Sequence, residues 1–306
     1  MSKAGQLRLF TAPAPGLLAI PDTISRALEK GATLVVSVSG GKDSQAMLLK
    51  LAAWFRRNDF PGQLVAVHAD LGRAEWADTP AFVERICQEA DAPLTVVRRP
   101  GGDMVARFEQ RAAKLVGTDK PFWSSSANRY CTSDMKRGPI DTYLRQFEGV
   151  VISAEGLRAD ESRARADKPV MEVRTQISNG KRTAYNWRPI LHWNEDEVWE
   201  AIGTTSAALY NRQSMYRRGY HDEALDGWRG HPAYVYGNTR LSCALCVLGS
   251  KADLLNGANH NPDLYAHYLK LEREGKATFK AGWSLAQLTV SGRAKELRDE
   301  ILKQPQ

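Results

Sequence analysis

Cysteine is scarce in this sequence, which has only four among 306 residues, at positions 87, 131, 243 and 246. So few cysteines in a chain of this length exclude the dense disulfide framework that stabilises many small secreted domains. Cysteines at this low number are more typical of metal binding or of catalysis. We therefore examine them below as candidate ligands.

Long apolar runs are also absent. No stretch of 18 consecutive apolar residues occurs, so we expect no membrane span. The first residues lack the basic start and the continuous apolar region that mark a secretory signal peptide. We therefore expect a cytoplasmic protein, and its 43% hydrophobic content is enough for one large domain or two small ones.

Acidic residues are outnumbered by basic ones, which gives a net charge of +7. This excess permits a polyanionic partner such as DNA or tRNA without requiring one. The alternative is a soluble enzyme whose arginines bind its own nucleotide. Part of the excess is local, because eight Lys and Arg residues fall between positions 158 and 188.

Strand and helix patterns alternate through the first two thirds of the chain. Short apolar, β-branched runs predict strands at 33–36, 64–69, 94–97 and 150–153. Helical spacing or helix-start residues predict helices at 21–30, about 45–57, 79–90, 138–147 and 284–303. The alternation predicts an α/β fold with a doubly wound, mostly parallel sheet.

The sequence suggests three regions. Residues 1–20 hold two prolines and form a loose N-terminal arm, and 21–202 form the α/β domain. Residues 203–306 form a cysteine-bearing region of loops and helices, in which 203–240 is rich in Tyr, Arg and Gly and has no clear period. A long segment of that kind is usually a functional loop, and its aromatic residues favour order.

The string Ser39-Gly40-Gly41-Lys42-Asp43-Ser44 lies between the first predicted strand and the helix that follows it. Glycines let a backbone approach a ligand closely, and the free N–H groups of a helix N-terminus attract phosphate. The adjacent glycines and the acidic residue after Lys42 do not fit a Walker A loop. The string therefore predicts a different phosphate-binding loop, and the alternative is an ordinary glycine turn.

Two further segments lie near the carboxyl ends of predicted strands, where ligands bind in such sheets. Asp70 ends the second strand, and the fourth is followed by a stretch that includes Gly156, Arg158, Glu161, Ser162 and Arg163. Arginine has the planar fork of donors that suits phosphate, although a charged solvated turn is the alternative interpretation. Farther on, Asn194 is placed to cap a helix that starts at Glu195.

Together with residues 186–199, these segments resemble the phosphoadenosine phosphosulfate (PAPS) reductase family, within the PP-loop adenine nucleotide α-hydrolase superfamily. The resemblance covers about residues 25–250 and implies a Rossmann-like PP-loop fold. It also implies cleavage of ATP between its α and β phosphates, with Mg²⁺. The implied catalytic residues are Lys42, Asp43 and Ser44. The nucleotide-binding residues would be Ser39, Gly40, Gly41, Lys42, Asp43, Ser44, Asp70, Gly156, Arg158, Glu161, Ser162 and Arg163.

The last two cysteines form a C-x-x-C turn, Cys243 to Cys246, which aims two thiolates at one ion or cluster. The family resemblance adds Cys131, because cluster-bearing relatives hold a [4Fe–4S] cluster with such residues. We therefore expect these three cysteines to hold a [4Fe–4S] cluster. The alternatives are Zn²⁺ with a histidine such as His231 or His260, or thiols that bind no metal. Cys87 is expected in the core.

One departure from the family concerns the reaction. Sulfonucleotide reductases attack sulfur with a cysteine in a C-terminal tail, whereas no cysteine follows Cys246 here. We therefore expect an adenylating ATP pyrophosphatase in sulfur transfer. Its acceptor would be a nucleic acid, either DNA or tRNA, and a cysteine desulfurase is a candidate sulfur donor. The alternatives are a reductase that acts on a small sulfonucleotide and a non-catalytic nucleotide sensor.

Overall fold

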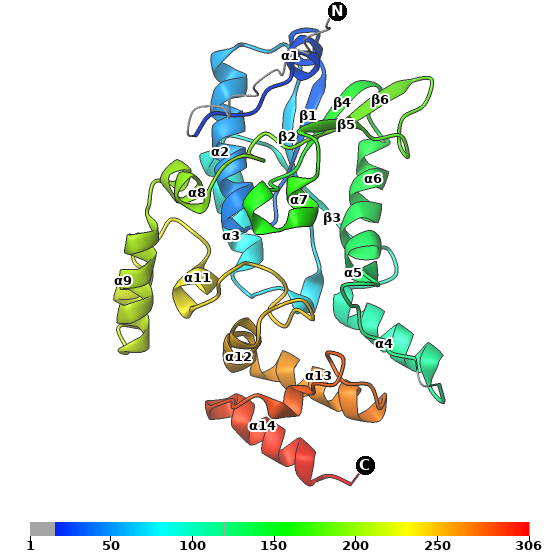
Figure 1. Cartoon of the computed structure of the whole chain (residues 1–306), viewed down its shortest axis with the longest axis vertical. Helices are drawn as coiled ribbons and strands as arrows, with labels where there is room; N and C mark the ends of the chain where they lie inside the picture. The colour runs from blue at the N-terminus through cyan, green and yellow to red at the C-terminus, as the bar shows by residue number, and fades with distance from the viewer. Residues whose placement is uncertain (1–15, 119, 306) are drawn as a thin grey trace, which may run out of the picture.

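The computed structural model describes residues 16–118 and 120–305, so most of the predicted N-terminal arm lies outside the described residues. At its centre is a six-stranded sheet (Figure 1). Its strands are β1 (Thr33–Ser37), β2 (Leu64–Ala69), β3 (Leu94–Val97), β4 (Gly149–Ala154), β5 (Met171–Val173) and β6 (Arg182–Trp187). The four strands expected from the sequence are β1 to β4, and their predicted positions are confirmed.

The strand order is β3-β2-β1-β4-β6-β5. All neighbouring pairs are parallel except β5 and β6, which pair antiparallel at one edge. From β1 the sheet extends through β2 to β3 in one direction, and from β4 it extends through β6 to β5 in the other. The carboxyl ends of β1 and β4 therefore lie side by side at the point where the order reverses, which is where doubly wound sheets bind ligands.

Helices cover both faces of the sheet. The described residues form α1 (Asp22–Glu29), α2 (Lys42–Arg57), α3 (Thr79–Glu89), α4 (Met104–Leu115), α5 (Tyr130–Thr132), α6 (Gly138–Leu144), α7 (Arg163–Ala166), α8 (Glu195–Ile202), α9 (Ser206–Arg217), α10 (His221–Leu225), α11 (Pro232–Tyr236), α12 (Lys251–His260), α13 (Pro262–Glu274) and α14 (Gly292–Lys303). Three short 3₁₀-helices are η1 (Gly72–Ala74), η3 (Ala159–Glu161) and η4 (Leu285–Gln287), and η2 (Ser133–Arg137) is a short π-helix.

Successive side chains of β1 point alternately into two apolar layers, one on each face of the sheet. Leu34 and Val36 pack with α1, α2, α3 and α8 on one face, whereas Val35 packs with Leu144 of α6 on the other. This arrangement is the predicted doubly wound α/β fold. Burial on both faces explains why β1 reads as a continuous apolar run rather than an alternating one.

A second apolar core lies beyond the sheet, where α12, α13 and α14 pack with α4. Tyr268, Trp123 and Phe279 are among its buried aromatic residues, and Cys131 and Cys243 pack against its edge. In Figure 1 these C-terminal helices lie together below the carboxyl ends of β1 and β2. The predicted division into three regions stays a prediction.

Two segments differ from the sequence-based expectation. The segment 203–240 is largely helical, in α9, α10 and α11, rather than an irregular loop. None of the residues of α9 is fully buried, which removes the apolar period that would have predicted it. The last helix begins at Gly292 instead of 284, because Ser284 caps the separate short turn η4.

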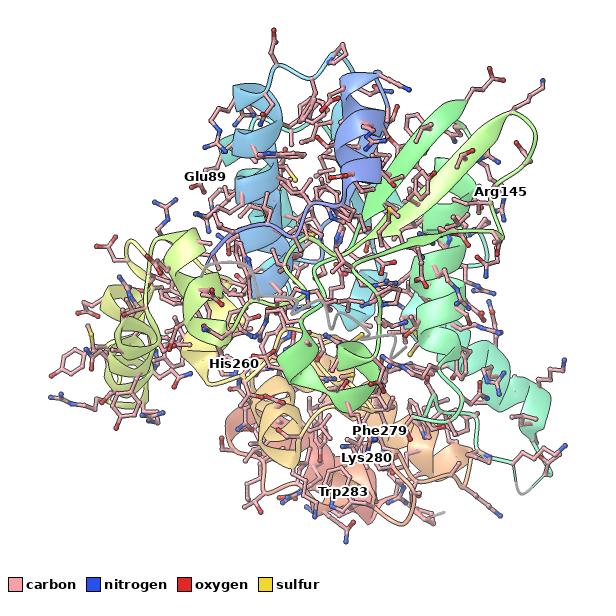
Figure 2. All side chains as sticks on the ribbon, turned by 45° about the horizontal axis from the view of Figure 1, so that its top comes forward. Glu89, Arg145, His260, Phe279, Lys280 and Trp283 are labelled. Carbon is pink, nitrogen blue, oxygen red and sulfur yellow. The ribbon has the colours of Figure 1, made fainter. Side chains whose placement is uncertain are left out.

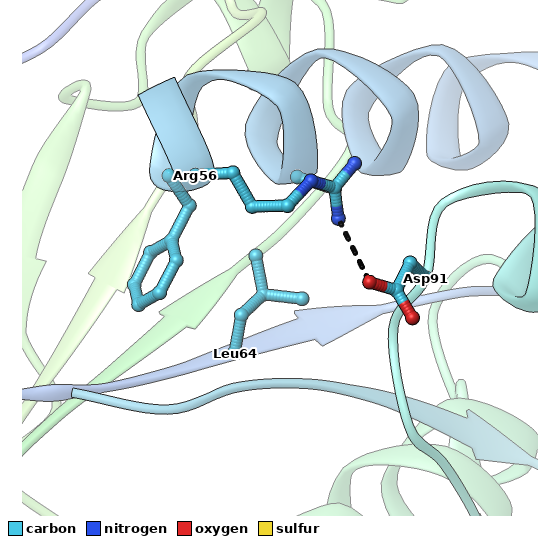
Figure 3. A pocket seen from close by; sticks show the side chains of 5 residues that line it. Arg56, Leu64 and Asp91 are labelled. Carbon is cyan, nitrogen blue, oxygen red and sulfur yellow. Dashed lines mark ion pairs between the residues drawn. The ribbon is translucent and has the colours of Figure 1, made fainter. Parts of the chain in front are cut away.

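A small cavity, of about 170 Å³, lies on the surface of the sheet domain at the amino end of β2 (Figure 3). Leu64 lines it together with Arg56 and Asp91, whose side chains form an ion pair at 3.9 Å. It lies at the end of the strands opposite to the predicted phosphate loop, so it is not part of the site described below. Among the described residues, no helix combines the length and the apolar character needed to cross a membrane.

Candidate functional site

The turn between β1 and α2 has the geometry of an anion-binding loop. Gly40 has φ +79°, a conformation that side chains disfavour. The amide N–H of Ser39 donates to Ser44 Oγ at 3.1 Å, and Ser44 Oγ donates to the Gly41 carbonyl at 2.9 Å. These bonds hold the loop closed on itself, so the first turn of α2 points its N–H groups toward the end of the sheet.

Lys42 is the one long cation of this loop and is only 5% exposed. Its Nζ lies 3.6 Å from Asp43 Oδ2 and 3.7 Å from Oε1 of Glu195, the first residue of α8. It also lies 5.7 Å from the centre of the Tyr234 ring. Packing between α2 and α8 therefore keeps a charged amine at the loop, balanced by carboxylates.

Arg158 faces Asp43 rather than open solvent. The Arg158 side chain is buried, its Nε donates to Asp43, and its Nη1 donates to Asp160 at 2.5 Å. Burial lowers the pKa of this guanidinium, but the neighbouring carboxylates outweigh that effect and raise its pKa. In this structure Arg158 fixes the position of the Asp43 carboxylate.

Gly156 lies against the start of α2. A Cβ atom at this position would come within 3.1 Å of the Ser44 amide nitrogen and 3.2 Å of the Asp43 carbonyl carbon and oxygen. The backbone after β4 therefore approaches the phosphate loop as closely as packing allows. The structure thus brings together the loop, Gly156 and Arg158.

The other predicted nucleotide-binding residues are less closely associated with the loop. Asp70, at the end of β2, accepts from the Gly72 amide and from Arg98 Nε, each at 2.6 Å. Glu161 pairs with Arg165 and accepts from the Arg158 amide. Ser162 and Arg163, at the start of α7, are exposed.

The three cysteines of the predicted metal site come from two distant segments. Cys131 lies in α5, where Ser124 Oγ donates to its sulfur at 3.0 Å, and Cys243 and Cys246 lie in the loop between α11 and α12. Burial raises the pKa of the Cys243 thiol to about 12, with smaller contributions from the Cys246 and Cys131 thiolates. The fold therefore places all three thiols within electrostatic range of each other.

Basic side chains surround these thiols. Arg240 Nη2 lies 3.8 Å from Cys246 Sγ, and Lys136 lowers the pKa of Cys243. Lys280 is in the C-terminal region near Phe279 and Trp283 (Figure 2), and its pKa is lowered by burial although Cys246 opposes this effect. Thiolates with cations around them are suited to a group that carries negative charge.

The thiols do not converge as ligands of one ion. Within residues 16–118 and 120–305, no three His, Cys, Asp or Glu side chains are grouped to hold a metal ion. Both ring nitrogens of His231 make hydrogen bonds, to Thr79 and Ala233, and burial lowers its pKa to about 3. The nitrogens of His260 contact Asn256 and Tyr216. Neither histidine is therefore free to complete a zinc site in this structure.

One segment joins the phosphate loop to the cysteines. Tyr234 Oη accepts a hydrogen bond from the Lys42 amide at 3.0 Å. Leu241 lies 3.3 Å from where a Cβ of Gly40 would be, and Cys243 follows two residues later. Sequence reasoning missed Tyr234 and Leu241, because no local pattern reveals a contact between residues about 200 positions apart. Cys87 packs in the core, where burial raises its pKa to about 11.

Two solved structures are similar to this chain at low identity. One is a Candida glabrata FMN adenylyltransferase in complex with FMN and the ATP analogue AMPCPP, with 18% identity and a TM-score of 0.36 over 63% of this chain and 54% of that chain. The other is the U34-tRNA thiolase NcsA from Methanococcus maripaludis with its [4Fe-4S] cluster, with 12% identity and a TM-score of 0.37 over 92% of this chain and 75% of that chain. This chain thus spans little more than half of the adenylyltransferase. No curated protein sequence matches it.

Comparison with protein families gives a match to the phosphoadenosine phosphosulfate reductase domain over residues 33–222. The matched region begins at β1 and contains the phosphate loop, all six strands and the segment with Gly156 and Arg158. It covers more than half of the chain and confirms the resemblance inferred from the motifs. The chain belongs to the phosphoadenosine phosphosulfate reductase domain family.

Proposed function

We propose that this protein is an ATP pyrophosphatase-type enzyme that adenylates a substrate in sulfur transfer. The observation that carries the proposal is the direct packing of a cysteine-bearing segment on a PP-loop, through Tyr234 and Leu241. Such packing places nucleotide chemistry and sulfur chemistry at one end of the sheet. A nucleotide-using PP-loop enzyme follows from the family, and the sulfur-transfer role is our proposal.

The loop residues have separate roles in the proposed reaction. The backbone of Gly40 and Gly41 and the hydroxyls of Ser39 and Ser44 bind the pyrophosphate part of ATP. A substrate oxygen attacks the α phosphorus, the bond to the bridging oxygen breaks, and pyrophosphate leaves with the bond electrons. Lys42 stabilises the negative charge that develops on this leaving group.

Asp43 is the candidate ligand of Mg²⁺. Its carboxylate is held between Arg158 and Lys42, so its orientation is set before a nucleotide arrives. Oxygen ligands of this kind suit Mg²⁺, which usually bridges protein carboxylates and substrate phosphates. In this proposal Gly156 and Arg158 act by shaping the loop, and Asp70, Glu161, Ser162 and Arg163 are candidate contacts for the rest of the nucleotide or its acceptor.

We propose a [4Fe–4S] cluster rather than a single zinc ion as the ligand of Cys131, Cys243 and Cys246. Tetrahedral zinc with bonds of about 2.3 Å holds thiolate sulfurs about 3.8 Å apart, and the three thiols do not converge in this way. A cluster spreads its thiolate ligands over different irons, and the surrounding Arg240, Lys136 and Lys280 balance its charge. When bound by Cys131, Cys243 and Cys246, such a cluster would supply an iron that can hold sulfur.

A nucleic acid is the proposed acceptor, either DNA or tRNA, with a cysteine desulfurase as a candidate sulfur donor. The net charge of +7 supports a polyanionic partner. Binding that falls steeply with salt would support this acceptor. A small sulfonucleotide as the preferred substrate would instead favour the reductase alternative.

The decisive experiment follows ATP labelled on its α phosphate. The protein should release AMP and pyrophosphate, or form an adenylated acceptor and pyrophosphate. Lys42→Ala should slow this reaction by about 100- to 1,000-fold, because it removes the charge at the leaving group. Lys50→Ala is the matched control, since Lys50 is exposed on the same helix. ADP as the only product would contradict the proposed cleavage, and tight ATP binding without turnover would favour the sensor alternative.

A second experiment tests the cluster. Anaerobic reconstitution followed by iron and sulfide analysis should give about four of each per chain, as the composition of the cluster requires. Fewer than about two irons per chain would contradict the cluster. Zinc in an equimolar amount would support the zinc alternative instead.

A further inference from the structure

Two carboxylates hold the ammonium group of Lys42. Its Nζ lies 3.6 Å from Asp43 Oδ2 and 3.7 Å from Glu195 Oε1. The Lys42 side chain is only 6% exposed, so water contributes little to stabilising its charge. Asp43 belongs to the phosphate loop itself, whereas Glu195 is the first residue of α8. One of the two partners of Lys42 therefore comes from outside the loop.

The carboxylate of Glu195 is oriented by a buried side chain. The indole N–H of Trp199, one turn later in α8, donates to Glu195 Oε1 at 3.3 Å, and this is the same oxygen that faces Lys42. Trp199 is 1% exposed, and its ring lies 5.2 Å from that of Tyr234 and 5.6 Å from that of Trp228. A functional group is placed accurately when the residue that supports it is locked by packing. Trp199 thus fixes the direction of a carboxylate that is itself half-exposed.

The backbone that carries Glu195 is also held in place. Asn194 Oδ1 accepts from the Glu197 amide at 2.9 Å, and the Glu197 carboxylate accepts from the Asn194 amide. This reciprocal capping box stabilises the first turn of α8. The position of Glu195 is therefore set before any nucleotide is present.

Asp43 and Glu195 differ in their other contacts. Asp43 also pairs with Arg158, and in the proposed function its oxygens bind Mg²⁺. A carboxylate that turns toward Mg²⁺ gives up part of its interaction with Lys42. The other side-chain partner of the Glu195 carboxylate is a neutral indole, so Glu195 stays available to the ammonium group throughout the reaction.

We propose that Glu195 and Trp199 are positioning residues for Lys42, which hold its ammonium group at the leaving pyrophosphate while Asp43 binds Mg²⁺. This inference rests on the ATP cleavage of the proposed function. No bond to Glu195 forms or breaks and no proton moves, because the carboxylate acts through Lys42 on the charge of the leaving group. Loss of Glu195 should therefore slow the chemical step and leave nucleotide binding nearly unchanged.

The first test compares Glu195→Gln with Glu200→Gln in the full chain, by steady-state kinetics with ATP labelled on its α phosphate. Both residues lie in α8, but the exposed Glu200 side chain forms no hydrogen bond or ion pair within residues 16–118 and 120–305. Glu195→Gln should lower kcat about tenfold and change the KM for ATP by less than about twofold. The loss is moderate because the Glu195 side chain is 53% exposed. Glu200→Gln should keep both constants within about twofold of those of the parent protein.

The second test asks whether Glu195 acts through Lys42. In the Lys42→Ala background, Glu195→Gln should cause no further loss, because the group that it positions is gone. Trp199→Phe keeps an aromatic ring and removes the indole N–H, so it should lower kcat about threefold. Combined with Glu195→Gln, it should give the same kcat as Glu195→Gln alone.

The products separate this inference from the proposed function. Release of AMP by the parent protein, with an equal kcat in Glu195→Gln, would overturn the role of Glu195 and leave the cleavage of ATP in place. A loss that persists undiminished in the Lys42→Ala background would also overturn it, because Glu195 would then act independently of Lys42. An increase in KM at constant kcat would do the same. ADP as the only product, or no cleavage of ATP by the parent protein, would overturn both.

Discussion

The phosphate loop and the cysteine site differ in how completely their polar groups are paired before any ligand is present. At the loop, Lys42, Asp43 and Arg158 form a connected set of ion pairs with Glu195 and Asp160. At the cysteine site, three thiols lie near the cations Lys136 and Arg240, and no three His, Cys, Asp or Glu side chains of the described residues are grouped to hold a metal ion. The charged groups of the loop are thus paired with one another, whereas the thiols of the cysteine site are not gathered around a common point.

This difference matches the lifetimes of the two proposed ligands. A nucleotide enters and leaves in each catalytic cycle, so the loop must be stable in its absence, and paired charges provide this stability. A cluster stays bound, so its site can contain groups that are satisfied only when the cluster is present. The comparison therefore predicts that substitutions at the two sites affect different quantities.

The largest expected effect is the loss of the cluster in Cys243→Ser. A serine oxygen is a poor replacement for a thiolate on iron, so the iron content after reconstitution should fall close to zero. The stability of the metal-free protein should fall only modestly, because Cys243 packs at the edge of the second apolar core and its thiol makes no hydrogen bond with the described residues. Iron analysis and thermal unfolding measure the two quantities.

Cys87→Ala is the matched control for this substitution. Cys87 is buried in the sheet core, so its replacement should lower stability slightly and leave the iron content unchanged. Equal iron in Cys243→Ser and in the parent protein would remove Cys243 from the proposed ligands. Loss of iron in Cys87→Ala would show that iron binding simply follows overall stability.

Arg158→Gln should lower the stability of the protein and leave its iron content unchanged, which is the opposite of the result expected for Cys243→Ser. This change breaks a buried ion pair and should cost about 3 kcal/mol, at the low end of the usual range because Asp43 retains Lys42 as a partner. The melting temperature should fall by about 6 °C, with the iron content unchanged. Arg165→Gln removes a more exposed pair with Glu161, four residues away, and should cost at most about 0.5 kcal/mol. Equal losses in the two variants would contradict the pairing that distinguishes the loop.

The sequence predicts the first of these regions better than the second. The strand, glycine turn and helix at 33–57 are contiguous, so local patterns are enough to place Ser39 to Ser44 and the ends of β1 and β4. Cysteine spacing suggests Cys243 and Cys246 as ligands, and only the family resemblance adds Cys131.

The contact between the phosphate loop and the segment 203–240 could not be predicted from the sequence either. Helix α9 buries none of its residues fully and shows no apolar period, so the segment 203–240 reads as irregular. That segment contains Tyr234, which reaches Lys42 from 192 positions away in the chain. Long-range contacts of this kind depend on how the helices pack on the sheet, and local propensity does not encode that packing.

The smallest predicted effect concerns this interface. The Tyr234 hydroxyl accepts from the Lys42 amide, an N–H at the helix N-terminus of the kind that binds phosphate. A nucleotide phosphate that takes this N–H must first displace the hydroxyl. Tyr234→Phe leaves the N–H unpaired, so the variant should be less stable by about 1 kcal/mol without ligand and should bind ATP about fivefold more tightly.

Tyr236→Phe provides the control, because Tyr236 lies in the same helix and donates to Asp78 at 3.2 Å instead of contacting the loop. Calorimetric titration with a non-hydrolysable ATP analogue measures the affinity of both variants, and that of Tyr236→Phe should equal that of the parent protein. Weaker binding by Tyr234→Phe would mean that the hydroxyl itself contacts the nucleotide. The loop would then need a residue of the C-terminal region to bind the nucleotide. The contrast between a loop whose charged groups are already paired and a cysteine site whose thiols are not gathered would no longer hold.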